Sequence, residues 1–390
     1  MNKFSSKEKR DASIIKALLR AKKTVVKVAE EHGVSEATVR RVRDSVLTSE
    51  KKEENFNPHD PMVRSDVLRI IRKQKKKPFT LDLVASRLKT TVENAKKVLN
   101  HLSHHDGYNI VAAGDRWQLL DTLPPAEPLK LKRFLGKEHV FGVIGDKHMV
   151  SKYHRLDVLE AAYDVFQKRG VGSVLDCGNI IDGEFKFNKY ELHCIGAHNQ
   201  CQYVADHHPQ RSGITTYFIS GECHEGWYQS RDGIKIGWYI QKVCEDAGRK
   251  DLKWIGHIES DIILEQQLGP LHIRVMHPGG GTPYALSYPS QKMVESFQGG
   301  DKPHVLIMGH FHKFDFNYQR EVACLMPGCV QDQTPYMRKK KLAAHVGFCI
   351  VTIGARLDGT TGQIKVEWFP FYDRKYHQRL NQYGGELKIK

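Results

Sequence analysis

The chain has 390 residues, and its 60 Lys and Arg against 45 Asp and Glu give a formal net charge of +15. This length predicts two or more domains with room for a sizeable buried core. No apolar run approaches the roughly 20 residues that span a bilayer, and the N-terminus is charged, so we expect neither a membrane protein nor a secreted one. The eight cysteines form no Cys-x-x-Cys pair, which argues against a disulfide scaffold or a zinc finger. A cytoplasmic location is expected, in the host cytoplasm if the protein is viral.

The positive charge is concentrated at the start of the chain. Residues 1–140 carry 30 Lys and Arg against 18 Asp and Glu, a net charge of +12. Such an excess in about a third of the chain indicates a polyanionic partner for that third, and we expect DNA. A solvated basic face is the simpler alternative.

Residues 1–48 predict a helix-turn-helix. A short amphipathic helix over 12–19 is followed by two helices within 24–46, joined at Gly33 and capped at Ser35. The second helix exposes Arg, Ser and Thr side chains of the types that contact DNA grooves and phosphates. The predicted DNA-binding residues here are Arg40, Arg41 and Arg43, and an ordinary helical hairpin is the alternative.

Residues 49–62 are polar and predict a linker, and residues 63–121 predict a second small domain. Three helices followed by a hairpin with a Gly114-Asp115 turn resemble a winged helix. Its predicted DNA-binding residues are Lys96, Lys97 and Arg116, although winged helices also dock proteins. Three prolines in residues 122–138 predict a second linker.

From Val140 onward, apolar strands end in histidine-containing turns. The strand at 140–144 leads to Asp146 and His148, and the strand at 305–308 leads to His310 and His312. The strand at 273–276 leads to His277 and three glycines. Because the carboxyl edge of an open α/β sheet is where ligands usually bind, the three groups predict one convergent metal site.

Five ordered motifs in residues 139–390 resemble those of the calcineurin-like metallophosphoesterases. They are GDKH at 145–148, GNIIDG at 178–183, GECHE at 221–225, HPGGG at 277–281 and GHFH at 309–312. The resemblance implies a four-layer αββα sandwich. It also implies two divalent metal ions that activate water and bind a phosphate. Mn²⁺ is the metal we expect first, and Fe, Zn or Mg are the alternatives.

The same resemblance assigns roles to individual residues. Asp146, His148 and His312 would hold one metal, His277 and His310 the other, and Asn179 would bridge the pair. His224 would be the general acid that protonates the leaving alkoxide, with Asp182 as its orienting partner.

Two positions depart from the family pattern. Asn179 replaces the family's bridging aspartate, so the metal pair loses a negative charge. The third motif is one residue longer than Gly-Asn-His-Glu, so either Glu222 or Cys223 would take the place of the Asn ligand. We prefer Glu222, because an added carboxylate could restore the charge lost at Asn179.

Two further stretches lie near these motifs. Residues 184–214 are rich in His, Tyr and Gln and predict a lid or a substrate-side insertion. The run Met337 to Lys341 (MRKKK) could hold a DNA backbone near the metals, although an exposed charge run is the commoner explanation.

The sequence therefore predicts a metal-dependent phosphodiesterase acting on DNA, a nuclease directed to its substrate by the N-terminal modules. A DNA-binding regulator with a degenerate phosphoesterase domain is one alternative, and a small-molecule phosphatase or phosphodiesterase is another. A homodimer is the usual arrangement for helix-turn-helix readers. By analogy alone, the domain combination suits a phage or mobile-element protein.

Overall fold

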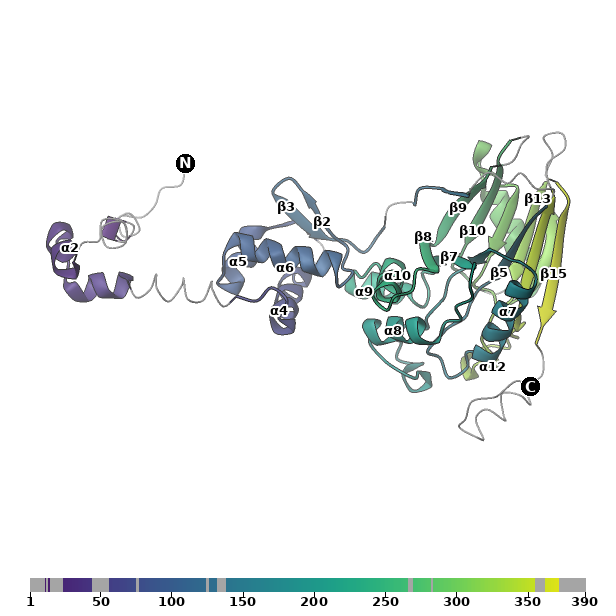
Figure 1. Ribbon diagram of the computed structural model, residues 1–390, viewed down its shortest axis with the longest axis horizontal. Helices are drawn as coiled ribbons and strands as arrows, with labels where there is room; N and C mark the ends of the chain where they lie inside the picture. Colours follow the sequence, from purple (N-terminus) through teal and green to yellow (C-terminus); the bar gives the residue numbers. More distant parts are fainter. Residues whose placement is uncertain are drawn as a thin grey trace. The chain divides into compact units, whose positions relative to one another are not determined.

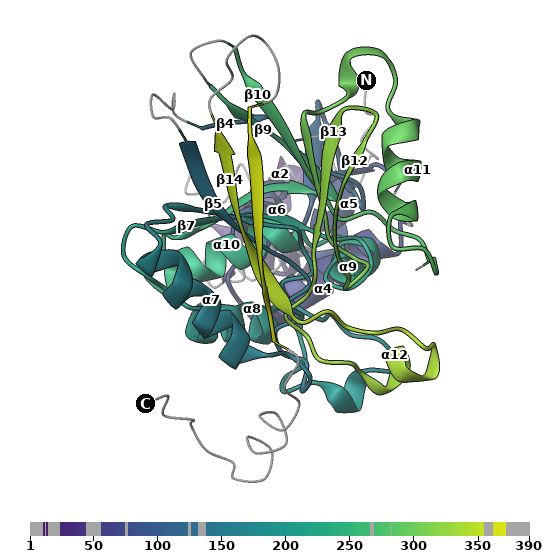
Figure 2. The ribbon, with the colours of Figure 1, turned by 90° about the vertical axis from the view of Figure 1, so that its right-hand side faces the viewer.

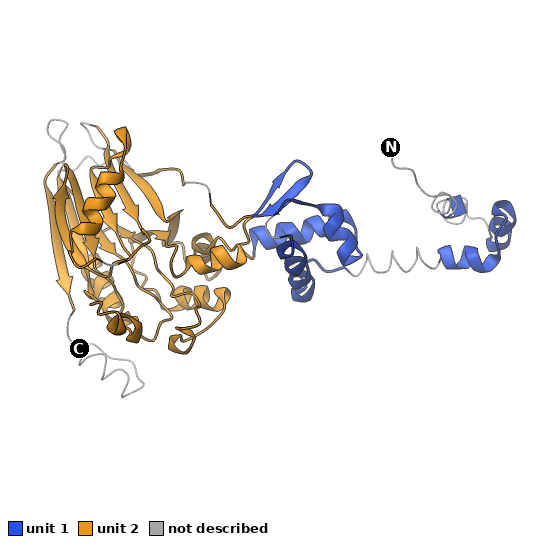
Figure 3. Cartoon of the chain, turned by 180° about the vertical axis from the view of Figure 1, so that it is seen from behind, with its two compact units in different colours: residues 1–105, 110–119 blue, residues 106–109, 120–390 orange. Residues whose placement is uncertain are grey.

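A computed structural model describes residues 11, 13–14, 24–43, 56–74, 77–123, 126–131, 138–265, 269–281, 283–354 and 362–371. The chain divides into two compact units, residues 1–105 with 110–119 and residues 106–109 with 120–390 (Figure 3). Most of the helix expected at 12–19 lies outside the described residues, as does the first half of the linker expected at 49–62. Among the described residues, no helix is long and apolar enough to cross a membrane.

The first unit begins with a pair of helices. Helix α2 (Val25–His32) starts at Thr24, whose hydroxyl accepts a hydrogen bond from the backbone of Lys27, and ends at Gly33 with a φ of 59°. Residues 36–43 are also helical, and the Ser35 hydroxyl accepts a 3.3 Å hydrogen bond from the Thr38 N–H. The side chains buried together are Ile14, Val28, Ala29, Val39 and Val42.

Three more helices of the first unit accompany a small sheet. They are α4 (Pro61–Arg72), α5 (Leu81–Leu88) and α6 (Val92–His104). The sheet has the order β1-β3-β2, with bounds Phe79–Thr80, Arg116–Leu119 and Ile110–Ala113. Helix α4 starts inside the predicted linker, because Asp60 caps it and Pro61 occupies its first turn, where a missing N–H costs nothing. Strand β1 is too short to leave a pattern in the sequence.

The second unit is built on two six-stranded sheets. One has the order β15-β14-β5-β6-β7-β8, and the other has the order β12-β13-β11-β10-β9-β4 (Figures 1 and 2). The strands of the first sheet, in chain order, are Glu138–Ile144, Ser173–Asp176, Thr215–Ser220, Leu252–His257, Gly347–Gly354 and Ile364–Pro370. Those of the second are Leu129–Leu131, Glu259–Leu264, Leu271–Met276, Val305–Met308, Phe314–Gln319 and Val322–Pro327.

Three hydrophobic clusters divide this unit into layers. Apolar side chains of both sheets meet between them, among them Val143, Ile273 and Ile307. The outer face of the first sheet is covered by α7 (Leu156–Lys168), α8 (Ala197–His207) and α10 (Ile236–Asp246). The outer face of the second is covered by α11 (Tyr288–Ser296), which Figure 2 shows on the side opposite α7. The expected αββα sandwich is therefore confirmed.

Two segments differ from their sequence-based interpretation. Residues 129–131, inside the predicted linker 122–138, form strand β4, which pairs in parallel with β9. Within the predicted lid, residues 189–191 form a short 3₁₀ helix, and α8 buries Cys201, Val204 and Ala205 in the core. The second half of that insertion is therefore part of the helical layer.

Candidate metal centre

The predicted ligands follow strands from both sheets. Asp146, Asn179 and His224 come after the neighbouring parallel strands β5, β6 and β7. His277 and the His310–His312 turn come after the parallel strands β10 and β11 of the other sheet. Because the carboxyl ends of parallel strands share one edge, the fold brings these side chains to one place.

The backbone at these turns is left-handed. Positive φ angles are found at Asp146 (49°), His148 (46°), Asn179 (52°), His310 (80°) and His312 (54°). Such angles are uncommon for residues with a Cβ and persist where the surrounding structure enforces them, often at functional sites. The glycines beside them allow close approach, since a Cβ at Gly309 would lie 2.7 Å from the carbonyl oxygen of Cys177.

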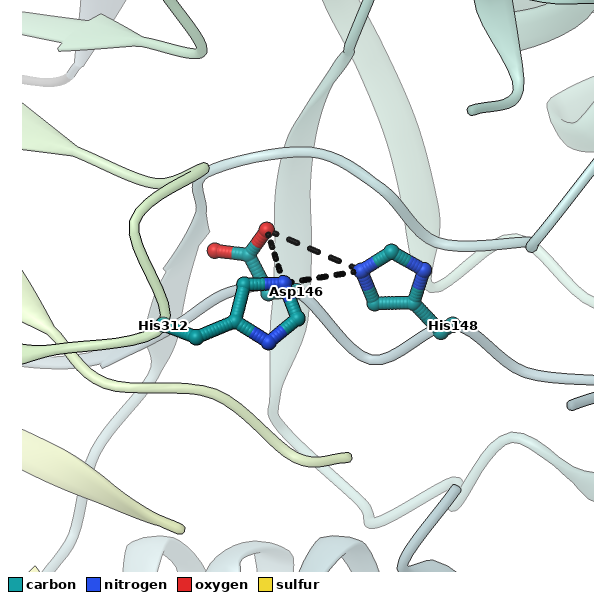
Figure 4. A group of neighbouring side chains, drawn as sticks. All are labelled: Asp146, His148 and His312. Carbon is teal, nitrogen blue, oxygen red and sulfur yellow. Dashed lines mark hydrogen bonds and ion pairs between the residues drawn. The ribbon is translucent and has the colours of Figure 1, made fainter. Parts of the chain in front are cut away.

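Asp146, His148 and His312 form a compact ligand group (Figure 4). Asp146 Oδ1 lies 3.3 Å from His312 Nε2 and 3.8 Å from His148 Nε2. The two Nε2 atoms are only 3.1 Å apart. A buried carboxylate oxygen and two ring nitrogens aimed at one another make a donor set suited to a divalent metal ion.

Further donors lie near the same oxygen of Asp146. His277 Nδ1 donates a 2.6 Å hydrogen bond to the carbonyl of Cys177, which leaves Nε2 as the free acceptor, 3.8 Å from Asp146 Oδ1. Within the described residues, His277 Nε2 and Asn179 Oδ1 are buried without a hydrogen-bond partner. Buried polar atoms rarely stay unpaired, so these two fit a second bound ion.

His310 lies near these further donors. Its backbone N–H donates to Asp146 Oδ2 at 2.8 Å, and its Nε2 lies 2.8 Å from the carbonyl oxygen of Gly280. The ring therefore offers Nδ1 to a metal. Glu222, the preferred replacement ligand, is exposed and belongs to no ligand group among the described residues. Burial and the charges of Glu222 and Asp146 raise the pKa of the half-buried Cys223 thiol.

Asp182 links the candidate ligand His148 to His224. Its Oδ1 lies 2.7 Å from His148 Nδ1 and 3.1 Å from His224 Nδ1. Burial alone would raise the pKa of Asp182, but hydrogen bonds from both histidines lower it overall. Burial likewise opposes protonation of His148, yet Asp146 and Asp182 raise its pKa to about 9. With Nδ1 held by Asp182, His224 keeps Nε2 for a substrate.

Two important residues were not predicted from the sequence. Lys147, between the two first-motif ligands, is fully buried and forms an ion pair with Asp176. Glu225 is also buried, and its carboxylate accepts hydrogen bonds from the backbone N–H groups of Asn179, Ile180, Ile181 and Gly221. Burial raises the pKa of Glu225 to about 7. The motif position of Glu225 could have revealed it, but nothing marked Lys147 as buried.

The predicted DNA-binding residues lie in the first unit. Arg40 and Arg41 are exposed, with Arg40 also paired to Glu36 at 3.1 Å, and Arg43 is half-buried. On the second small domain, Lys96 and Lys97 are exposed on α6 and Arg116 is exposed on β3.

A cavity of about 550 Å³ opens beside the candidate metal centre. Its lining includes Asn179, Asp182, His224, His310 and His312. The rest of its wall includes residues of the 187–191 segment and of α12 (Pro335–Lys339). A substrate in this cavity would contact both the metal ligands and His224.

No protein-family model matches this chain, and no curated protein sequence matches it. Among solved structures, an archaeal phosphodiesterase is similar with 14% identity and a TM-score of 0.31, over 59% of this chain and 99% of the other. Zn²⁺-complexed Vps29 from Entamoeba histolytica has 14% identity and a TM-score of 0.29, over 59% and 98%. A predicted phosphoesterase from Streptococcus pneumoniae has 11% identity and a TM-score of 0.28, over 60% and 98%.

Proposed function

We propose that the protein is a metal-dependent phosphodiesterase that cleaves DNA, with manganese as the first metal to test. The observation that carries this proposal is the group of ligands around Asp146, with the unpartnered His277 Nε2 and Asn179 Oδ1 beside it. These residues would hold divalent ions, which would supply Lewis acidity and lower the pKa of a bound water.

The chain's own residues supply the remaining chemistry. His224 is partly exposed and lines the cavity, so its Nε2 can donate a proton to the alkoxide that leaves the phosphate. Asp182 orients the ring through Nδ1 and is itself held by His148. The basic first 140 residues support DNA as the substrate, because a small phosphoester gains nothing from an extended basic surface.

The test is incubation of the full chain with linear and circular DNA in Mn²⁺, Mg²⁺, Zn²⁺ or EDTA. We expect metal-dependent cleavage that falls by about a hundredfold or more in His224→Ala, which lacks the proton donor. His310→Ala should also lose cleavage, because it removes a metal ligand. His198→Ala, an exposed histidine outside the cavity, is the matched control and should cleave normally.

The alternatives give different results. DNA that is bound but never cleaved with any metal would favour a regulator with a degenerate phosphoesterase domain, as the uncharged Asn179 suggests. Efficient turnover of small phosphoesters, with no cleavage of DNA, would favour a small-molecule enzyme.

A further inference from the structure

A column of aromatic rings leads outward from His224. The Phe185 ring lies 5.6 Å from the His224 ring, centroid to centroid, and stacks on Phe187 at 5.2 Å with an interplanar angle of 12°. Phe187 in turn stacks on Tyr336 at 5.5 Å and 20°. Phe185, Phe187 and Tyr336 are together called the aromatic column. It joins a loop after the second motif to helix α12, about 150 residues later in the chain.

Hydrogen bonds and a buried side chain hold the two segments of the aromatic column in place. The backbone N–H of Phe185 donates to Asn188 Oδ1 at 2.7 Å, and Asn188 Nδ2 donates to Asp182 Oδ2 at 3.1 Å. The loop is thereby tied to the carboxylate that orients His224. On the other side, the Thr334 hydroxyl caps α12, and Met337 anchors that helix in the interior.

Packing within the protein does not explain why the rings of Phe187 and Tyr336 lie at the surface. Phe187 is 60% exposed and Tyr336 is 49% exposed, and both line the cavity that holds the metal ligands. Exposed large aromatic side chains beside a polar site are typical of surfaces that bind another molecule. Glu191 also lines this cavity, but the flanking charges are mostly positive: Lys186, Lys189, Arg338, Lys339, Lys340 and Lys341 are all exposed.

Aromatic rings interleaved with basic side chains are the combination that binds single-stranded nucleic acid. Bases stack on the rings whatever their sequence, while Lys and Arg contact the phosphates. In a duplex the bases are already stacked on one another, so the rings can compete only for unpaired ones. A small phosphoester without a base would leave both rings exposed to water.

We propose that the aromatic column is a stacking site for an unpaired nucleobase next to the phosphodiester that occupies the metal centre. The preferred substrate is then a single strand, a frayed end or a gap. This inference rests on the proposed nuclease function, since it names the form of DNA that the same site accepts.

The experiment measures binding without cleavage. The full chain in EDTA is titrated into two fluorescent single-stranded oligodeoxynucleotides of equal length, one with normal bases and one with a central abasic tract. Both carry the same phosphates, so the basic N-terminal residues contribute equally to each. We expect wild type to bind the normal strand about tenfold more tightly, and Phe187→Ala/Tyr336→Ala to lose that preference.

Three further samples complete the design. Tyr336→Phe keeps the ring and should keep the preference. Tyr318→Ala removes an exposed tyrosine outside the cavity and should behave as wild type. A 2-aminopurine in the normal strand should be quenched by wild type and not by the double variant. Circular dichroism verifies that each variant is folded.

The stacking proposal is overturned if wild type binds both strands equally, or if the double variant keeps the preference. Neither result depends on hydrolysis. Base-dependent binding without cleavage in any metal would instead contradict the nuclease proposal and leave the stacking site intact.

Discussion

Asn179 stands where the resembled family has an aspartate, and its surroundings show what that change does. Its Nδ2 donates to Asp146 Oδ1 at 3.4 Å, and its Oδ1 is buried without a partner. An aspartate would place a second carboxylate against Asp146, which is unfavourable until a cation neutralises the pair. The amide should therefore stabilise the metal-free site and lower its affinity for a metal ion.

We predict that Asn179→Asp lowers the melting temperature without metal and enlarges the increase caused by Mn²⁺. A change of about 1 kcal/mol should shift the melting temperature by roughly 2–4 °C in a unit of this size. Calorimetry with and without metal, together with elemental analysis of bound metal, measures both effects. Asn199→Asp, on an exposed part of α8, is the control. Equal metal content and equal melting behaviour in wild type and Asn179→Asp would contradict the explanation.

At the scale of single residues, the sequence indicated which residues are candidate ligands better than it indicated which side chains are buried. The histidines after strands were visible because short apolar runs ended beside them. The burial of Lys147 could not be predicted, because lysine is almost never buried unless it is paired, and its partner Asp176 is the last residue of a different strand. The aromatic column was missed for the same reason, since Phe187 and Tyr336 belong to distant segments.

At the scale of elements, the Lys147–Asp176 ion pair fastens the turn after β5 to the end of β6. Both side chains are fully buried, and Asp176 also accepts a 3.1 Å hydrogen bond from the backbone of Gly178. Removing one member leaves an unpaired charge in the interior, which typically costs about 3–5 kcal/mol.

We predict that Lys147→Met destabilises the second unit by about this amount, and that Lys147→Met/Asp176→Asn recovers part of it. Urea unfolding of the full chain, followed by tryptophan fluorescence, measures the loss. If Lys147→Met has the same unfolding midpoint in urea as wild type, the ion pair contributes little to stability.

Strands with strong β-branched runs were predicted well. The expected strand at 305–308 coincides with β11, and the expected strand at 273–276 lies within β10. Strands β1 and β4 were missed, because two or three residues give no periodicity and their pairing partners lie far away in sequence. Three prolines before β4 in the sequence also favoured a linker.

At the scale of the whole molecule, the predicted DNA-binding residues and the candidate metal centre belong to different units. If the N-terminal residues bind phosphates, each lost contact should reduce the salt dependence of DNA binding. We predict that Arg40→Gln/Arg41→Gln makes the negative slope of log K against log salt shallower by about 2. Anisotropy titrations in EDTA at several salt concentrations measure it. Lys250→Gln, exposed in the second unit, should leave the slope unchanged.

The candidate ligands come from both sheets of the sandwich, with Asp146 and Asn179 on one and His277, His310 and His312 on the other. Neither sheet alone carries a complete site, so high-affinity metal binding must follow the docking of the sheets during folding. An ion bound by these residues would join the two sheets at one edge and oppose their separation. Metal should therefore slow unfolding far more than it speeds folding, which makes it a source of kinetic stability in the mature protein.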